Sequence, residues 1–158
     1  MRRKLYFIDV DGTVANNDHR VHLIQNGNSD WDEFFRPEQM VKDSPIQAAR
    51  AHFAEGRFLY GDFVFLTARI ESTHDVTKAW LIEHGFATDV TRVICKPNII
   101  RLQRSRVFKP SVLATVGRYD YPDREFVLIE DYGEVRRATE EAGFKTLHAP
   151  DCWNEWTL

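Results

Sequence analysis

Residues 5–14 read Leu-Tyr-Phe-Ile-Asp-Val-Asp-Gly-Thr-Val. The apolar and strand-favouring residues at 5–10 predict a β-strand that is buried within a sheet. Two carboxylates, Asp9 and Asp11, stand one residue apart where this strand gives way to a turn at Gly12. An isolated buried carboxylate is unfavourable, so the pair indicates a cation or a charged substrate close by.

Four more apolar runs follow along the chain, with helical patterns between them. We expect strands at residues 63–66, 91–94, 126–129 and 146–147, and helices at residues 45–55, 72–84, 109–116 and 133–142. Strands that alternate with helices at this interval predict a parallel sheet covered by helices. The expected fold class is therefore α/β, a three-layer Rossmann-like arrangement with about five parallel strands.

The length and composition indicate one globular domain spanning residues 1–158, because a chain of 158 residues has room for one core. Its 43% hydrophobic and 28% charged residues are ordinary for a soluble protein. The net charge of −3 argues against a protein held to nucleic acid by an overall positive field. A local basic patch around a phosphate site remains compatible with that charge.

No sequence feature indicates an extracellular or membrane setting. The two cysteines, Cys95 and Cys152, are too few for a disulfide scaffold and lack metal-ligand spacing. The apolar run near the N-terminus is cut short by Asp9, which a signal peptide would not contain, and no segment approaches membrane-spanning length. We expect a cytoplasmic protein with no membrane association.

Residues 14–44 break the alternation of strands and helices. This insertion is polar, and residues 31–37 form an aromatic helical patch, Trp-Asp-Glu-Phe-Phe-Arg-Pro. An insertion directly after the first strand of a parallel sheet lies above the strand ends, where ligands bind. It is therefore a candidate small cap or lid. The alternative is a surface loop with one helix packed on the body.

The Asp-x-Asp-Gly-Thr motif after an N-terminal apolar strand resembles the first motif of the haloacid dehalogenase-like superfamily of phosphohydrolases. Three later segments resemble the remaining motifs in the same order. The resemblance implies that Thr67 hydrogen-bonds the transferring phosphoryl oxygens and that Lys109, expected to open a helix, balances charge on a phosphoaspartate. It also implies that Glu130 and Asp131 complete a metal site, although Glu130 departs from the commoner aspartate.

The chemistry of phosphate transfer supports the same roles. A carboxylate nucleophile is repelled by a phosphate monoester unless cations intervene, and Mg²⁺ prefers oxygen ligands. Asp9, the backbone carbonyl of Asp11, and Asp131 are candidate ligands, and Glu130 is a candidate for orienting a metal-bound water. Asp9 would attack to form an acyl phosphate, while Asp11 would protonate the leaving oxygen and later activate water. Alternatives remain for two of these residues: Lys96 competes with Lys109, and Asp131 could cap the next helix.

A narrower resemblance covers nearly the whole chain. It combines the first motif with Trp-Asp-x-Phe-Phe at 31–35, Asp-Ser-Pro-Ile at 43–46, Thr-Ala-Arg at 67–69 and Trp-Leu at 80–81. This combination is similar to the phosphatase domain of phage-type polynucleotide kinase–phosphatases and their stand-alone relatives. The resemblance implies removal of a 3′-phosphate from DNA or RNA ends, with Arg69 contacting the substrate. The chain has no Gly-x-x-x-x-Gly-Lys-Ser/Thr loop, so the kinase half is absent.

Two other functions stay open at this point. A nucleotidase acting on free nucleoside monophosphates would use the same chemistry, and a non-catalytic binding module could adopt the same fold. In either enzyme the partner is a phosphorylated small molecule or a nucleic-acid end. Trp31 is a candidate for base stacking or for core packing, Thr13 for phosphate binding, and Lys96 together with Arg69 for backbone contacts. We expect the insertion to set substrate choice.

Overall fold

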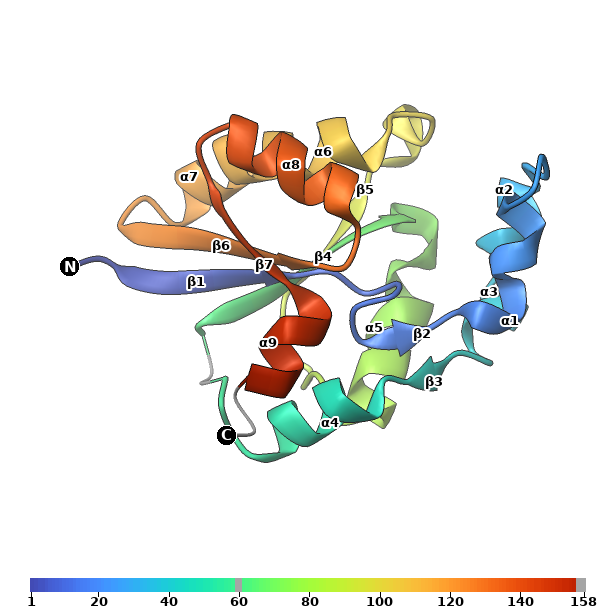
Figure 1. The fold of residues 1–158 in the computed structure, drawn as a ribbon, viewed down its shortest axis with the longest axis horizontal. Coiled ribbons are helices and arrows are strands. Elements are labelled where there is room, and N and C mark those ends of the chain that lie inside the picture. The colour runs from blue at the N-terminus through green and yellow to red at the C-terminus, as the bar shows by residue number, and fades with distance from the viewer. Residues whose placement is uncertain (59–60, 156–158) are drawn as a thin grey trace.

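The computed structural model describes residues 1–58 and 61–155 of the chain, the side chain of Glu155 excepted, and confirms the expected fold class. A five-stranded parallel sheet lies between two layers of helices (Figure 1). The strand order is β5-β4-β1-β6-β7. The strands are β1 (Arg3–Ile8), β4 (Phe63–Ile70), β5 (Val93–Lys96), β6 (Arg124–Glu130) and β7 (Lys145–His148).

Strand β1 occupies the centre of the sheet and is covered on both faces. Leu5 and Phe7 belong to one buried core, and Ile8 belongs to the other. Both faces are therefore apolar, which explains why the run at the start of the chain does not alternate with polar residues. The first core includes residues of α6 (Ser105–Val112) and α8 (Gly133–Glu141); the second includes residues of α4 (Gln47–Ala54), α5 (His74–Glu83) and α9 (Ala149–Glu155).

The shorter helical elements are connectors between these larger ones. They are η2 (Glu71–Thr73), η3 (Asn98–Ile100), η4 (Leu113–Gly117) and α7 (Arg118–Asp120). Helix α6 differs from the expectation, because it begins at Ser105 and places Lys109 one turn inside the helix rather than at its start. The expected start at Lys109 came from the resemblance, and Pro110, which follows it, lies inside the helix. Helix α9 was not expected at all.

The insertion folds as a small lobe whose two ends are joined by a pair of short strands. Strands β2 (Ala15–Asn16) and β3 (Ser44–Pro45) pair in antiparallel fashion and bring the two ends of the lobe together. Figure 1 shows the lobe beyond the carboxyl end of β1, on the side of the sheet where ligands are expected. Between the two strands lie α1 (Asp18–Val21), η1 (His22–Ile24), α2 (Trp31–Phe34) and α3 (Pro37–Met40).

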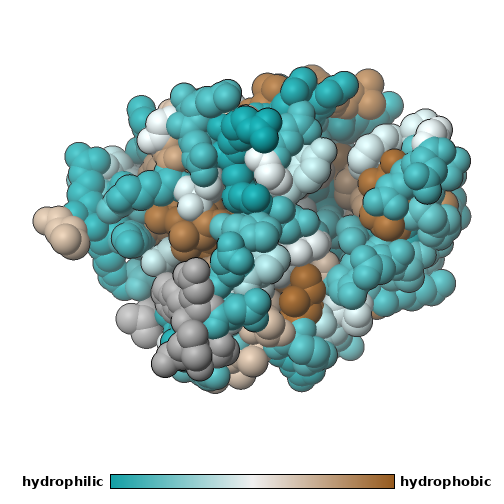
Figure 2. Space-filling model, viewed as in Figure 1, coloured by the Kyte–Doolittle hydropathy of each residue, from teal (hydrophilic) through white to brown (hydrophobic). Residues whose placement is uncertain are grey.

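The molecular surface offers no broad apolar face in the view of Figure 2, where hydrophilic residues predominate and hydrophobic ones form small separate patches. Within residues 1–58 and 61–155, no helix combines the length and the apolar character needed to cross a membrane. The longest of the α-helices described here, α5, has ten residues.

Candidate active site

The candidate site lies where the strand order of the sheet reverses. The chain places β4 and β5 on one side of β1 and then returns to place β6 and β7 on the other. Ligands of open parallel sheets bind at the carboxyl ends of the strands beside such a reversal. Asp9 follows β1, while Glu130 and Asp131 mark the end of β6, its neighbour. The backbone N–H of Asp9 donates to the carbonyl oxygen of Ile129 at 3.0 Å, which ties the two strand ends together.

Three carboxylates meet at these strand ends and are here called the acidic cluster: Asp9, Glu130 and Asp131. One oxygen from each lies within 4.8 Å of the others. Asp9 and Glu130 are buried, and Asp131 is partly exposed. Burial, the charge of Glu130 and the charge of Asp131 raise the pKa of Asp9 well above its ordinary value, against the lowering effect of Lys109. Such crowding is relieved by a cation, so the acidic cluster could hold a metal ion.

Lys109 provides one positive charge inside the cluster. Its Nζ donates to Asp9 Oδ1 at 2.6 Å and to Glu130 Oε2 at 2.5 Å. Burial would lower the pKa of Lys109, but the two carboxylates outweigh it and raise that pKa above its ordinary value. Three ionised carboxylates and one ammonium group sum to a formal charge of −2. A divalent cation would neutralise that charge.

The competing lysine lies outside the cluster. Lys96 Nζ donates to the carbonyl oxygen of Gln103 at 2.5 Å. Burial and the nearby charge of Lys109 lower the pKa of Lys96. Of the two candidates that the sequence offered, the structure therefore places Lys109 beside the carboxylates, and no carboxylate is paired with Lys96 in the part of the chain described.

The turn after Asp9 requires glycine for two reasons. Gly12 has a φ of +78°, and a Cβ atom at this position would lie 2.2 Å from Asp131 Oδ2. The turn then presents Thr13, whose hydroxyl donates to Asp9 Oδ2 at 3.0 Å. The indole N–H of Trp153, from helix α9, donates to the carbonyl oxygen of Thr13 at 2.9 Å and holds the turn from the other side.

In the turn after β6, the Asp131 carboxylate does not cap the next helix. Arg136 Nη1 donates to the carbonyl oxygens of Glu130 at 3.0 Å and of Asp131 at 2.6 Å. Helix α8 begins at Gly133, and no side chain caps its N-terminus. The alternative that Asp131 serves as a helix cap is therefore wrong, and its carboxylate belongs to the acidic cluster.

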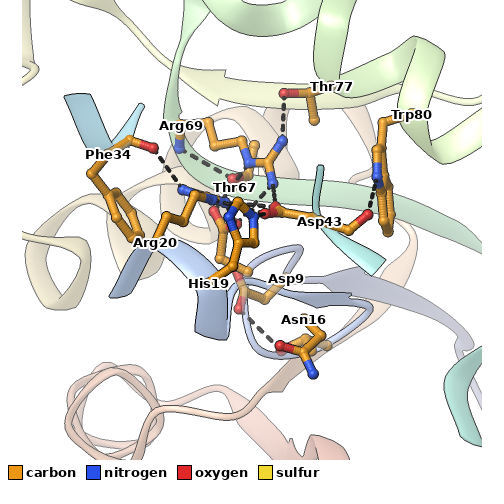
Figure 3. Close-up of polar contacts among 12 residues, drawn as sticks. Asp9, Asn16, His19, Arg20, Phe34, Asp43, Thr67, Arg69, Thr77 and Trp80 are labelled. Atoms are coloured by element: carbon orange, nitrogen blue, oxygen red, sulfur yellow. Dashed lines mark hydrogen bonds and ion pairs between the residues drawn. The ribbon is translucent and has the colours of Figure 1, made fainter. Parts of the chain in front are cut away.

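Asp11 is bonded by two buried arginines, Arg20 and Arg69, both labelled in Figure 3. Arg69 donates through Nε to Asp11 Oδ2 at 3.1 Å and through Nη2 to Oδ1 at 2.8 Å. Arg20 Nη2 donates to the same Oδ1 at 2.6 Å. Burial would raise the pKa of Asp11, but the two guanidinium groups outweigh it and lower that pKa to about 2. The acid–base role predicted for Asp11 therefore begins from an ionised carboxylate.

The sequence analysis missed two residues that join this arrangement, Arg20 and Asp43. Asp43 accepts from Arg20 Nε at 2.9 Å and Nη2 at 2.7 Å, and from Arg69 Nη2 at 3.0 Å. All three side chains are buried. Arg20 and Asp43 come from the insertion and Arg69 from β4, so the insertion is bonded to the sheet through charged groups. Arg20 had no sequence signal beyond its place in a polar loop, and Asp43 was named only as the first residue of the Asp-Ser-Pro-Ile segment, without a role.

The remaining predicted residues lie around these groups. Thr67 is buried within β4, and its hydroxyl accepts the backbone N–H of Arg69 at 3.1 Å. Phe34 is buried beneath Arg20, whose guanidinium carbon lies 4.3 Å from the ring centroid. Trp31 is 51% exposed and stacks against Phe35, with ring centroids 5.9 Å apart. The residues of the aromatic patch therefore differ in their surroundings: Phe34 packs against Arg20 in the interior, and Trp31 is exposed to solvent.

Comparison of the chain with protein-family models finds no match, and comparison with curated proteins finds none either. Arguments about function therefore rest on the motifs and on the geometry described above.

Proposed function

We propose that this protein is a Mg²⁺-dependent phosphomonoesterase of the haloacid dehalogenase-like type, with Asp9 as the nucleophile. The observation that carries the proposal is the acidic cluster with its single lysine, because its formal charge of −2 matches a divalent cation. Carboxylate oxygens are the ligands that Mg²⁺ prefers, so Asp9, Glu130 and Asp131 fit this ion by chemistry and by their proximity. A buried ion pair that served stability alone would not need the third carboxylate.

The proposed reaction has two steps on this chain's own residues. A carboxylate oxygen of Asp9 bonds to phosphorus and the bond to the leaving-group oxygen breaks. Asp11, which is ionised at the start, first takes up a proton from the solvent and then supplies that proton to the leaving oxygen. Asp11 then removes a proton from water, which cleaves the acyl phosphate to inorganic phosphate and restores Asp9. Lys109 and the hydroxyls of Thr13 and Thr67 offset charge on the phosphoryl oxygens. Mg²⁺ would polarise a phosphoryl oxygen and offset the charge of Asp9.

For the substrate, we propose the 3′-phosphate of a nucleic-acid end. The insertion lobe lies beyond the carboxyl end of β1 (Figure 1), and its helix α2 begins with Trp31, which is 51% exposed. A base stacked on an aromatic ring is held by about 1–3 kcal/mol without base-specific hydrogen bonds. The same exposed ring would serve a free nucleoside monophosphate, so a nucleotidase is the second candidate function.

The test is phosphate release by the purified chain. With Mg²⁺ we expect turnover of an aryl phosphate, and with excess chelator we expect none, because the acidic cluster would lack its neutralising cation. A panel of 3′-phosphorylated oligonucleotides, 3′- and 5′-mononucleotides and sugar phosphates then separates the two candidate substrates. Absence of release from every substrate with Mg²⁺ present would refute the proposed enzyme and favour a binding module.

Replacing Trp31 by alanine should weaken selection of nucleotides alone. We expect KM for a nucleotide substrate to rise by about 5- to 150-fold, the equivalent of 1–3 kcal/mol of stacking, with aryl phosphate turnover unchanged. Tyr119→Ala is the matched control, because Tyr119 is an 89% exposed aromatic residue on α7, away from the lobe (Figure 1). Equal losses on aryl and nucleotide substrates would show that Trp31 does not contact the base.

A further inference from the structure

Asp43 is the most completely bonded carboxylate around the site. Oδ1 accepts from Arg20 Nε at 2.9 Å and lies 2.7 Å from His19 Nε2, while Oδ2 accepts from Arg20 Nη2 at 2.7 Å and Arg69 Nη2 at 3.0 Å. Its backbone carbonyl accepts the indole N–H of Trp80 at 2.9 Å (Figure 3). The carboxylate is fully buried, so it is not placed to contact a substrate. Its bonds are to the arginines instead.

The two arginines reach both aspartates through the same atoms. Nη2 of Arg20 and Nη2 of Arg69 each donate to Asp11 Oδ1 and to Asp43 Oδ2. Two guanidinium groups and two carboxylates make a neutral buried set of alternating charges. Without Asp43, two buried cations would share Asp11 alone, and an uncompensated buried charge is strongly unfavourable. The place of each arginine, and through it the place of Asp11, therefore depends on Asp43.

We propose that Asp43 is a positioning residue for Asp11. It holds Arg20 and Arg69 side by side, and these two arginines bond both oxygens of the Asp11 carboxylate. The inference rests on the proposed function, in which Asp11 transfers protons. It also gives the insertion a second task, because Arg20 and Asp43 both belong to it and support the chemistry as well as the choice of substrate.

The chain contains a matched control at the opposite end of the sheet. Asp62 likewise bridges two arginines: Arg3 Nη2 donates to its Oδ2 at 2.8 Å and Arg124 Nη2 to its Oδ1 at 2.7 Å. These arginines lie at the amino ends of β1 and β6, away from Asp11. Asp62→Asn removes the same kind of bridging charge as Asp43→Asn, and both changes keep the size of the side chain.

The activity test compares an aryl phosphate with an alkyl phosphate, because only the alkoxide leaving group needs a proton from Asp11. In Asp43→Asn we expect kcat/KM for the alkyl phosphate to fall at least about tenfold more than for the aryl phosphate, within the range of general acid catalysis. Acid-quenched aryl phosphate reactions should contain more phosphoenzyme than wild type, since water activation by Asp11 is slowed as well. Asp62→Asn should leave both the ratio and the phosphoenzyme level unchanged.

A second measurement does not depend on activity. Nitrogen-15 spectra of the metal-free protein report the Nε–H group of Arg69, which bonds Asp11 and not Asp43. We expect this signal to shift or broaden in Asp43→Asn and to stay unchanged in Asp62→Asn. If Asp43→Asn fails to fold, Arg20→Lys replaces it, because lysine keeps the charge but loses the planar fork that bridges the two aspartates.

The outcomes separate the inference from the proposed function. A folded Asp43→Asn with an unchanged Arg69 signal and an unchanged alkyl-to-aryl ratio overturns the inference while the enzyme assignment stands. A wild-type protein that releases no phosphate overturns the proposed function. In that case a shifted Arg69 signal would still support the positioning of Asp11 by Asp43, and an unchanged signal would overturn it.

Discussion

Asp9→Asn is expected to abolish phosphate release while the fold stays intact. The amide keeps the shape of the side chain but cannot attack phosphorus, so we expect kcat to fall by at least about 10⁴-fold. Lys109 retains its ion pair with Glu130. The substitution also removes a buried carboxylate that is close to two others, so the midpoint of thermal unfolding should not decrease.

The measurement combines steady-state phosphate release, acid-quenched phosphoenzyme and circular dichroism. Asp89→Asn is the control, because Asp89 is an exposed aspartate and its side chain has no role in the site described. The variant at Asp9 should form no phosphoenzyme, whereas the variant at Asp89 should match wild type. Near-normal turnover by Asp9→Asn would mean that water attacks the substrate directly, and the covalent route would be wrong.

The sheet was predictable because its central strands are covered on both faces. A continuous apolar run such as that of β1 or β6 is stable only when it is buried, and its short length indicates a strand rather than a helix. Helix α9 was not predictable in the same way. Its reason lies in tertiary packing, because Trp153 fills the core beside β1 and bonds the turn at Thr13, 140 positions away in sequence.

The candidate site likewise has one part that could be predicted from the sequence and one part that could not. The convergence of Asp9 with Asp131 was predictable, because carboxylates that end parallel strands meet at one edge of the sheet. The arrangement of Arg20 and Asp43 around Asp11 was not, because it depends on the β2–β3 pairing that closes the insertion. No local spacing in the sequence specifies that pairing. The lowered pKa of Asp11 could not be predicted either, because it depends on Arg20 and Arg69 lying beside its carboxylate.

Lys109→Met is expected to be the most damaging change for both stability and activity. It leaves Asp9 and Glu130 buried side by side with no cation between them, and removing one partner of a buried ion pair costs about 3–5 kcal/mol of unfolding free energy. Activity should be lost too, because the ammonium group that bonds Asp9 and Glu130 would no longer offset charge on the phosphoryl oxygens. Lys96→Met gives the comparison: Lys96 bonds one backbone carbonyl, so we expect a cost of about 1 kcal/mol.

Magnesium makes this prediction specific to the proposed site. Without Lys109 the formal charge of the acidic cluster falls from −2 to −3, so a divalent cation should stabilise Lys109→Met more than it stabilises wild type. Urea denaturation with and without Mg²⁺ measures the difference, and Lys96→Met should respond as wild type does. If Mg²⁺ stabilised all three proteins equally, the cation would bind elsewhere. The assignment of Asp9, Glu130 and Asp131 as its ligands would then be wrong, because the charge of Lys109 acts on these carboxylates at hydrogen-bonding distance.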